Sequence, residues 1–298
     1  MSTAYRIFAA TALLVSLQAL TASPRPVTAA QSGTSTKDRA QTEYRGFRLL
    51  NGTCNVTDLT CHQRGPRSWK RHEIESLHTA IDDVLQRPLG SAVVRESQRH
   101  GADVLQRYAL GTENDGTISH IVNAAFHSPS SGRSFIEMTD RFFEKGGQRD
   151  QRAQYLLQTR IFLHELFHAI DDQGERFSMV NDEFASLIGL VHIDHGWRRI
   201  NVTESEEQIQ YDVANRIKQL LTQNQYEDAW NAGRVYATRP EIGLPSMRAL
   251  DSPAEAFAEI GAHLLLDPTV ATYLKPQVTD YFRNRVFPTF ADPRKPGL

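Results

Sequence analysis

The segment that most constrains this chain is residues 152–172, a predicted helix that is apolar on nearly every face. A helix that is hydrophobic all round is buried, so this segment is expected at the centre of the fold. Its apolar residues are Tyr155, Leu156, Leu157, Ile161, Phe162, Leu163, Phe167 and Ile170. Gly174 follows at a position where helices commonly end. Three polar residues interrupt this apolar run, and buried polar groups need partners.

These three residues are His164, Glu165 and His168, which form an H-E-x-x-H pattern. Because an α-helix has 3.6 residues per turn, the two histidines share one face and their imidazoles can bind one divalent ion. The side chain of Glu165 is rotated by about 100° from His164, which places its carboxylate beside the ion. A carboxylate there can take a proton from metal-activated water. The pattern predicts a Zn²⁺ centre with Glu165 as the catalytic base, and a structural hydrogen-bonded cluster is the alternative.

A catalytic zinc ion usually has three protein ligands and a water molecule, so one ligand is missing from this helix. The metzincin pattern would place a third histidine at position 174, which is Gly174 here. The better candidate lies in the segment Ser252-Pro-Ala-Glu255-Ala-Phe-Ala-Glu259, which is a predicted helix with a serine N-cap and proline at its first position. The two glutamates lie on one face of an otherwise apolar helix and require a counter-charge.

We expect Glu255 to be the third ligand. We expect Glu259 to orient a ligand histidine by contacting its imidazole, without binding the metal itself. Three alternatives stay open. Glu255 could instead close a capping box with Ser252. Glu259 could be the ligand itself, or the ligand could come from His192 or His195.

The remaining periodicity predicts an α+β, mostly helical domain with a small sheet that precedes the active-site helix. Apolar residues at helical spacing predict further helices over 72–87, 181–195, 204–223 and 253–266. Strands are predicted over 118–126 and 135–139, separated by a turn at 128–132. By analogy with zincin folds, the strand at 135–139 is expected to be an edge strand to which an extended peptide can add.

The N-terminus resembles a signal peptide over residues 1–30, with Arg6 before an apolar stretch of 14 residues and small residues near position 30. An uncleaved membrane anchor is the alternative. Residues 31–46 are polar and predict a flexible spacer, and residues 47–298 are expected to form the zincin-like domain. We therefore expect a secreted or periplasmic protein with no stable membrane insertion after cleavage.

Cysteine content and charge agree with export and argue against a nucleic-acid partner. The only two cysteines, Cys54 and Cys61, are close in sequence, and in an exported protein they predict a disulfide bond. The chain has 33 Lys and Arg residues against 35 Asp and Glu residues, with no basic block. A protein that binds nucleic acid usually carries a basic surface, so that class is not expected.

Two segments resemble known metallopeptidases. Residues 162–172 resemble the active-site helix of the anthrax lethal factor-like metallopeptidases, and residues 255–259 resemble their glutamate-ligand helix. Residues 266–283 are similar to the end of the Mlc titration factor A family, so the resemblance covers residues 155–290. It implies a gluzincin with zinc on His164, His168 and Glu255, and with Glu165 as the base.

One position departs from these families, which place a tyrosine seven residues before the glutamate ligand to stabilise the oxyanion. Here that residue is Arg248, so Arg248 and the more distant Tyr236 are the two candidates for this role. The expected function is a secreted zinc-dependent metalloendopeptidase that acts on proteins or peptides. A zinc amidase on small or cell-wall substrates, and a non-catalytic, metal-stabilised binding or toxin-like protein, are the alternatives.

Overall fold

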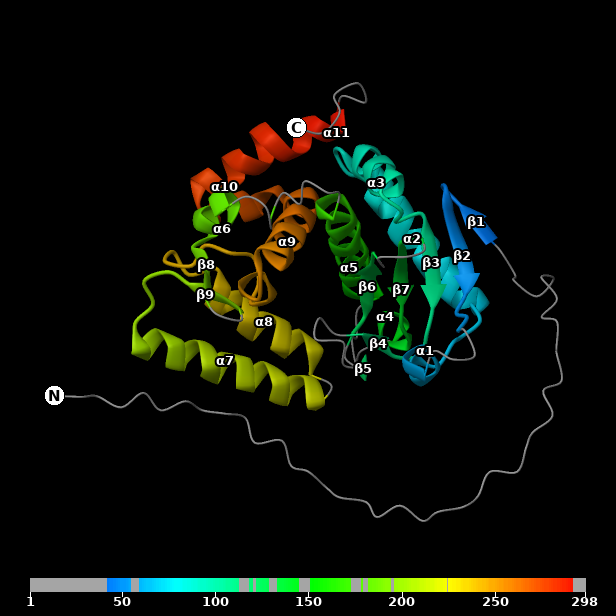
Figure 1. Ribbon diagram of the computed structural model, residues 1–298, viewed down its shortest axis with the longest axis horizontal. Helices are drawn as coiled ribbons and strands as arrows, with labels where there is room; N and C mark the ends of the chain where they lie inside the picture. Colours follow the sequence, from blue (N-terminus) through cyan, green and yellow to red (C-terminus); the bar gives the residue numbers. More distant parts are fainter. Residues whose placement is uncertain are drawn as a thin grey trace, which may run out of the picture. The chain divides into compact units, whose positions relative to one another are not determined.

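The N-terminal half of the chain forms a five-stranded mixed sheet, as the computed structural model in Figure 1 shows. The structure describes residues 42–54, 59–112, 118–119, 122–128, 133–144, 151–172, 178, 182–193, 196–223 and 225–291. The strand order is β1-β2-β3-β7-β6, with β2, β3 and β7 parallel and the two outer strands antiparallel to their neighbours. The strands are β1 (Thr42–Tyr44), β2 (Phe47–Asn51), β3 (Val104–Arg107), β6 (Ala124–His127) and β7 (Phe135–Met138).

The strand that was expected at the edge of the sheet lies inside it. β7 pairs in parallel with β3 through Leu105 and Ile136, and in antiparallel fashion with β6 through Phe126 and Ile136. Both of its edges are therefore filled, and the edge strand on this side of the sheet is β6, with β1 at the opposite edge. The predicted strand 118–126 is divided into β5 (Ile118–Ser119), which pairs with β4 (Gly111–Thr112), and β6.

The described helices account for most of the rest of the chain, so the predicted α+β class is confirmed. They are α1 (Leu59–Arg64), α2 (Arg71–Gln86), α3 (Gly90–Arg99), α4 (Asp140–Phe143), α5 (Gln151–Asp171), α6 (Asp182–Ile188), α7 (Glu204–Thr222), α8 (Tyr226–Ala237), α9 (Pro253–Leu266), α10 (Pro276–Tyr281) and α11 (Phe287–Ala291). Short turns of other helix types are η2 (Arg248–Leu250), η3 (Pro268–Thr272) and η4 (Phe282–Val286). The predictions over 72–87, 152–172, 204–223 and 253–266 correspond to α2, α5, α7 and α9.

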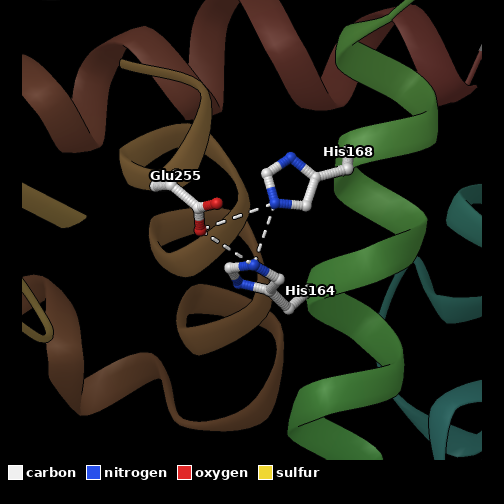
Figure 2. A group of neighbouring side chains, drawn as sticks. All are labelled: His164, His168 and Glu255. Atoms are coloured by element: carbon white, nitrogen blue, oxygen red, sulfur yellow. Dashed lines mark hydrogen bonds and ion pairs between the residues drawn. The ribbon is translucent and has the colours of Figure 1, made fainter. Parts of the chain in front are cut away.

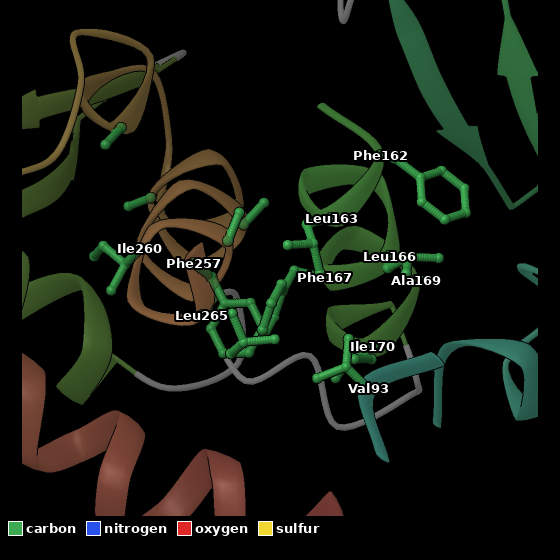
Figure 3. Close-up of a cluster of buried hydrophobic side chains, with 14 of the residues drawn as sticks. Val93, Phe162, Leu163, Leu166, Phe167, Ala169, Ile170, Phe257, Ile260 and Leu265 are labelled. Carbon is green, nitrogen blue, oxygen red and sulfur yellow. The ribbon is translucent and has the colours of Figure 1, made fainter. Parts of the chain in front are cut away.

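The long apolar helix α5 lies at the centre of the core, as its composition predicts. It contacts α2, α3 and the edge strand β6, and it packs along α9 (Figure 1). Figure 3 shows Phe167 of α5 beside Phe257 of α9 in this interface, with ring centroids 6.0 Å apart. Gly261 permits the close approach of the two helices, because a Cβ atom there would lie 2.5 Å from the Phe167 ring. The tight α5–α9 contact fixes the relative position of any side chains that the two helices share.

The predicted helix over 181–195 is wrong in its second half. α6 ends at Ile188, and Gly189 then adopts a φ of +80°, a left-handed conformation that favours glycine and ends helices. The next four residues, which include the β-branched Val191 and Ile193, form β8 (Leu190–Ile193), which pairs with β9 (Gly196–Arg199) as a hairpin.

Cys54 and Cys61 form a disulfide bond with Cα atoms 5.5 Å apart, as predicted. The predicted signal peptide and residues 31–41 of the predicted spacer lie outside the described residues. Residues 42–46 of that spacer form β1 and its turn, so the folded part begins earlier than position 47. Among the helices that the structure describes, none is long and apolar enough to cross a membrane.

Candidate metal centre

Helix α5 brings the two histidines of the H-E-x-x-H pattern together. Their Nε2 atoms lie 2.9 Å apart, and their rings are nearly perpendicular at 82° (Figure 2). His164 is buried, whereas His168 is partly exposed. Two imidazole nitrogens directed at one point form half of a tetrahedral metal site.

Helix α9 adds a carboxylate to this pair. Ser252 caps the helix through its hydroxyl, which accepts from the amide of Glu255 at 3.2 Å. The Glu255 side chain reaches the imidazoles, with Oε2 lying 3.2 Å from Nε2 of His164 and 3.6 Å from Nε2 of His168 (Figure 2). The N-cap that fixes the start of α9 therefore also fixes where this carboxylate lies.

The spacing of the three donor atoms fits a tetrahedral metal ion. Zinc bonds of about 2.0–2.1 Å with tetrahedral angles require donor atoms about 3.3 Å apart. The three observed separations are 2.9, 3.2 and 3.6 Å. Within the described part of the chain, His164, His168 and Glu255 are the one group of three or more such side chains that could hold a metal ion. The residues present could therefore hold a metal ion.

Glu259 lies behind His164, one turn after Glu255 on α9. Its Oε1 is 2.9 Å from Nδ1 of His164, the nitrogen that faces away from the other donors. A carboxylate in this place orients a ligand imidazole and raises its basicity. The geometry therefore favours Glu259 as a partner of His164 over Glu259 as a direct ligand.

The two carboxylates control the protonation of His164. Burial alone would lower the pKa of this imidazole, but Glu255 and Glu259 outweigh burial and raise the pKa to about 9. Burial alone would likewise raise the pKa of Glu255, and the two imidazoles with the Arg248 guanidinium instead hold it well below its ordinary value. In the metal-free chain at neutral pH, His164 is therefore protonated. Its positive charge then balances part of the negative charge of Glu255 and Glu259.

Two guanidinium groups flank the buried carboxylates. Arg248 of η2 donates to Glu255 through two nitrogens, from Nε to Oε2 at 2.6 Å and from Nη2 to Oε1 at 3.2 Å. Arg160 of α5 donates through Nη1 to Oε2 of Glu259 at 3.5 Å. These pairs reduce the free-energy cost of burying Glu255 and Glu259 side by side.

Glu165 follows His164 on α5 and faces the edge strand β6 of the sheet. It is buried, and its Oε2 accepts a hydrogen bond from the backbone amide of Phe126 on β6 at 2.7 Å. This bond holds the carboxylate next to the outer edge of the strand. Sequence reasoning missed the contact with Phe126, because no local pattern shows which strand lies at the edge.

The candidates for stabilising an oxyanion occupy different surroundings. Arg248 lies beside the candidate metal ligands, because it donates two hydrogen bonds to Glu255. Its side chain is about half exposed, at 53%. The hydroxyl of Tyr236 accepts from Nη1 of Arg199 on β9 at 3.2 Å, and the Tyr236 side chain is buried. Of the alternative ligands, His192 is exposed on β8 and packs against Trp197, and His195 lies outside the described residues.

Sequence reasoning also missed Arg160. The only signal for it is its position one turn before His164, which places both side chains on the same face of α5.

Comparison of the chain with protein-family models, with curated proteins and with solved structures finds no match.

Proposed function

We propose that the protein is an exported zinc-dependent metalloendopeptidase that hydrolyses peptide bonds in proteins or peptides. The observation that carries the proposal is the convergence of His164, His168 and Glu255 from two separate helices onto one point. Glu165, the residue after His164, lies buried beside an edge strand. A mixed sheet with an antiparallel edge strand against an H-E-x-x-H helix supports a zincin-like fold.

In this proposal the three ligands are His164, His168 and Glu255. A zinc ion held by these three side chains would supply Lewis acidity to the scissile carbonyl and would lower the pKa of water towards about 7. Glu165 takes a proton from the attacking water and gives it to the leaving amine. The amide of Phe126 holds the Glu165 carboxylate in one orientation during these transfers.

The substrate is proposed to bind in extended form along β6. In the pairing of β6 with β7, Ala125 and His127 face Glu137 and Phe135, and the amide of Phe126 is directed towards Glu165. The outer edge of β6 therefore runs beside the proposed base. An extended peptide that adds to this edge would carry its backbone past Glu165.

Export is proposed from two features. The N-terminal sequence resembles a signal peptide, and the chain forms a disulfide bond. Disulfide bonds are typical of proteins in oxidising compartments. Secretion or the periplasm is the proposed location.

The test is a peptide-library digest with the Zn²⁺-loaded full chain and its Glu165→Gln variant. Loss of a general base costs about 10²–10⁴-fold in turnover, and the variant should still bind one zinc ion, because Glu165 is not a ligand. Glu207→Gln is the matched control, since Glu207 is exposed on α7. Wild-type turnover in the Glu165→Gln variant would contradict the mechanism.

A further inference from the structure

We propose that Arg160 is a positioning residue of the metal centre, and that Trp230 of α8 in turn holds Arg160 in place. The side chain of Arg160 fixes the Glu259 carboxylate in the orientation from which Glu259 contacts His164. This inference rests on the proposed metal centre, but it does not require the protein to be a peptidase.

The carboxylate of Glu259 is shared between His164 and Arg160. Its Oε1 lies 2.9 Å from Nδ1 of His164, and its Oε2 accepts from Nη1 of Arg160 at 3.5 Å. The two oxygens of one carboxylate thus contact two different residues of α5. Because the Glu259 side chain is only 5% exposed and that of Arg160 only 17%, solvent contributes little to holding either group. A rotation of the carboxylate away from Arg160 would also disturb its contact with His164.

The guanidinium of Arg160 is supported by the aromatic ring of Trp230. The guanidinium carbon of Arg160 lies 3.7 Å from the centroid of the Trp230 ring, well within the range of a cation–π interaction. The same indole is stacked with His263 of α9, with an angle of 10° between the ring planes. Nδ1 of His263 lies 2.7 Å from the backbone oxygen of Glu259, to which it donates. Trp230 therefore contacts both residues that flank Glu259.

Trp230 comes from a helix of the segment that connects α5 to α9. α8 lies between the H-E-x-x-H helix α5 and the glutamate helix α9 in the chain, and it contributes Trp230 to the surroundings of Glu259. Helix α8 thus contributes to the surroundings of Glu259 and is not only a connection. A displacement of α8 would be transmitted through Arg160 and Glu259 to a metal ligand.

The direction in which Zn²⁺ affinity changes distinguishes a positioning role of Arg160 from a purely electrostatic one. A positive charge near a divalent cation repels it, so the loss of a guanidinium with no positioning role would tighten metal binding. Loss of a group that orients a ligand through its partner typically weakens metal binding by about 10–100-fold. We expect Arg160→Met to weaken Zn²⁺ binding by about tenfold or more.

The experiment measures the dissociation constant of Zn²⁺ for the full chain by competition with a chromophoric chelator. Arg160→Met is compared with Trp230→Leu, which should weaken binding in the same direction and less strongly. Arg107→Met is the control, because Arg107 of β3 is also a buried arginine in carboxylate ion pairs, with Glu73 of α2 and Asp140 of α4, and neither carboxylate belongs to the proposed metal centre. It should lower the thermal midpoint and leave the dissociation constant unchanged.

A second readout uses Co²⁺ in place of Zn²⁺. The d–d absorption of the Co²⁺ protein should change in Arg160→Met, because the His164 ring is no longer held in one orientation, and it should be unchanged in Arg107→Met. If Arg160→Met fails to fold, Arg160→Lys replaces it. Lysine keeps the charge but loses the planar fork, so several-fold weaker Zn²⁺ binding is expected.

Unchanged or tighter Zn²⁺ binding in the folded Arg160 variant would overturn the proposal, even if the thermal midpoint falls. Weaker binding in Arg160→Met, in a protein that shows no peptidase activity, would support this inference and count against the proposed function. A wild-type chain that binds no Zn²⁺ would overturn both.

Discussion

Binding of Zn²⁺ at neutral pH is expected to release about one proton, and that proton comes from His164. In the metal-free chain, the carboxylates of Glu255 and Glu259 raise the pKa of His164 to about 9. A metal ligand must present a neutral imidazole nitrogen, so the ion competes with this proton.

The size of the competition follows from the pKa. At pH 7 the imidazole lies about two pH units below its pKa, so about 100 chains carry the proton for each chain that does not. Zinc affinity at pH 7 should therefore be about 100-fold weaker than with a neutral His164, or about 3 kcal/mol. Between pH 7 and pH 9 the affinity should rise by about tenfold for each pH unit.

Isothermal titration calorimetry in buffers with different ionisation enthalpies measures the number of protons released. At pH 7 the dependence of the observed heat on buffer enthalpy should correspond to about one proton per Zn²⁺. Glu259→Gln removes one of the two carboxylates that hold the proton, so the number should fall. Glu183→Gln is the control, because Glu183 forms an exposed ion pair with Arg285.

A buffer-independent heat at pH 7, with Zn²⁺ binding intact, would refute this reasoning. It would mean that His164 is already neutral in the metal-free chain. An unchanged proton number in Glu259→Gln would show that Glu259 does not hold the proton.

Three further predictions concern stability. Because the folded pKa of His164 is raised above the unfolded value of about 6.5, its contribution is fully present below pH 6.5 and is lost as pH rises through about 9. The thermal midpoint of the metal-free chain, measured with a chelator, should therefore fall between these pH values, and a constant midpoint would contradict the assignment. Replacement of Cys54 and Cys61 by serine opens a loop of eight residues and should reduce the free energy of unfolding by about 2.5 kcal/mol in urea titrations, with no change expected if the bond does not form. Gly261→Ala places a methyl group against the Phe167 ring and should cost about 1–3 kcal/mol in the same assay, whereas a neutral result would mean that α5 and α9 can separate freely.

The parts of the fold that could be predicted are those with local signals. α5 is a long, nearly continuous apolar run, and α9 begins at a serine cap followed by proline, so both helices follow from short windows of sequence. The glutamates of α9 were found because two acids on an apolar helix need a counter-charge. Both signals lie within single helices and do not depend on how distant segments meet.

The parts that could not be predicted depend on distant segments. The identity of the edge strand is set by the parallel pairing of β3 with β7, which joins residues about 30 positions apart and has no local signal. The contacts of Arg160 with Trp230 and Glu259 likewise join three helices, and no spacing in the sequence indicates them. The end of α6 is different, because Gly189 is a local stop signal that the prediction of a helix over 181–195 overlooked.

The central claim is that one divalent cation is held by His164, His168 and Glu255. The most direct measurement is the metal content of the full chain by mass spectrometry, after exposure to Zn²⁺ and dialysis. Wild type and Glu165→Gln should each retain about one zinc ion per chain, and Glu255→Ala should retain almost none, since zinc needs three protein ligands. A metal-free wild type, or a Glu255→Ala variant that holds as much zinc as wild type, would contradict the account.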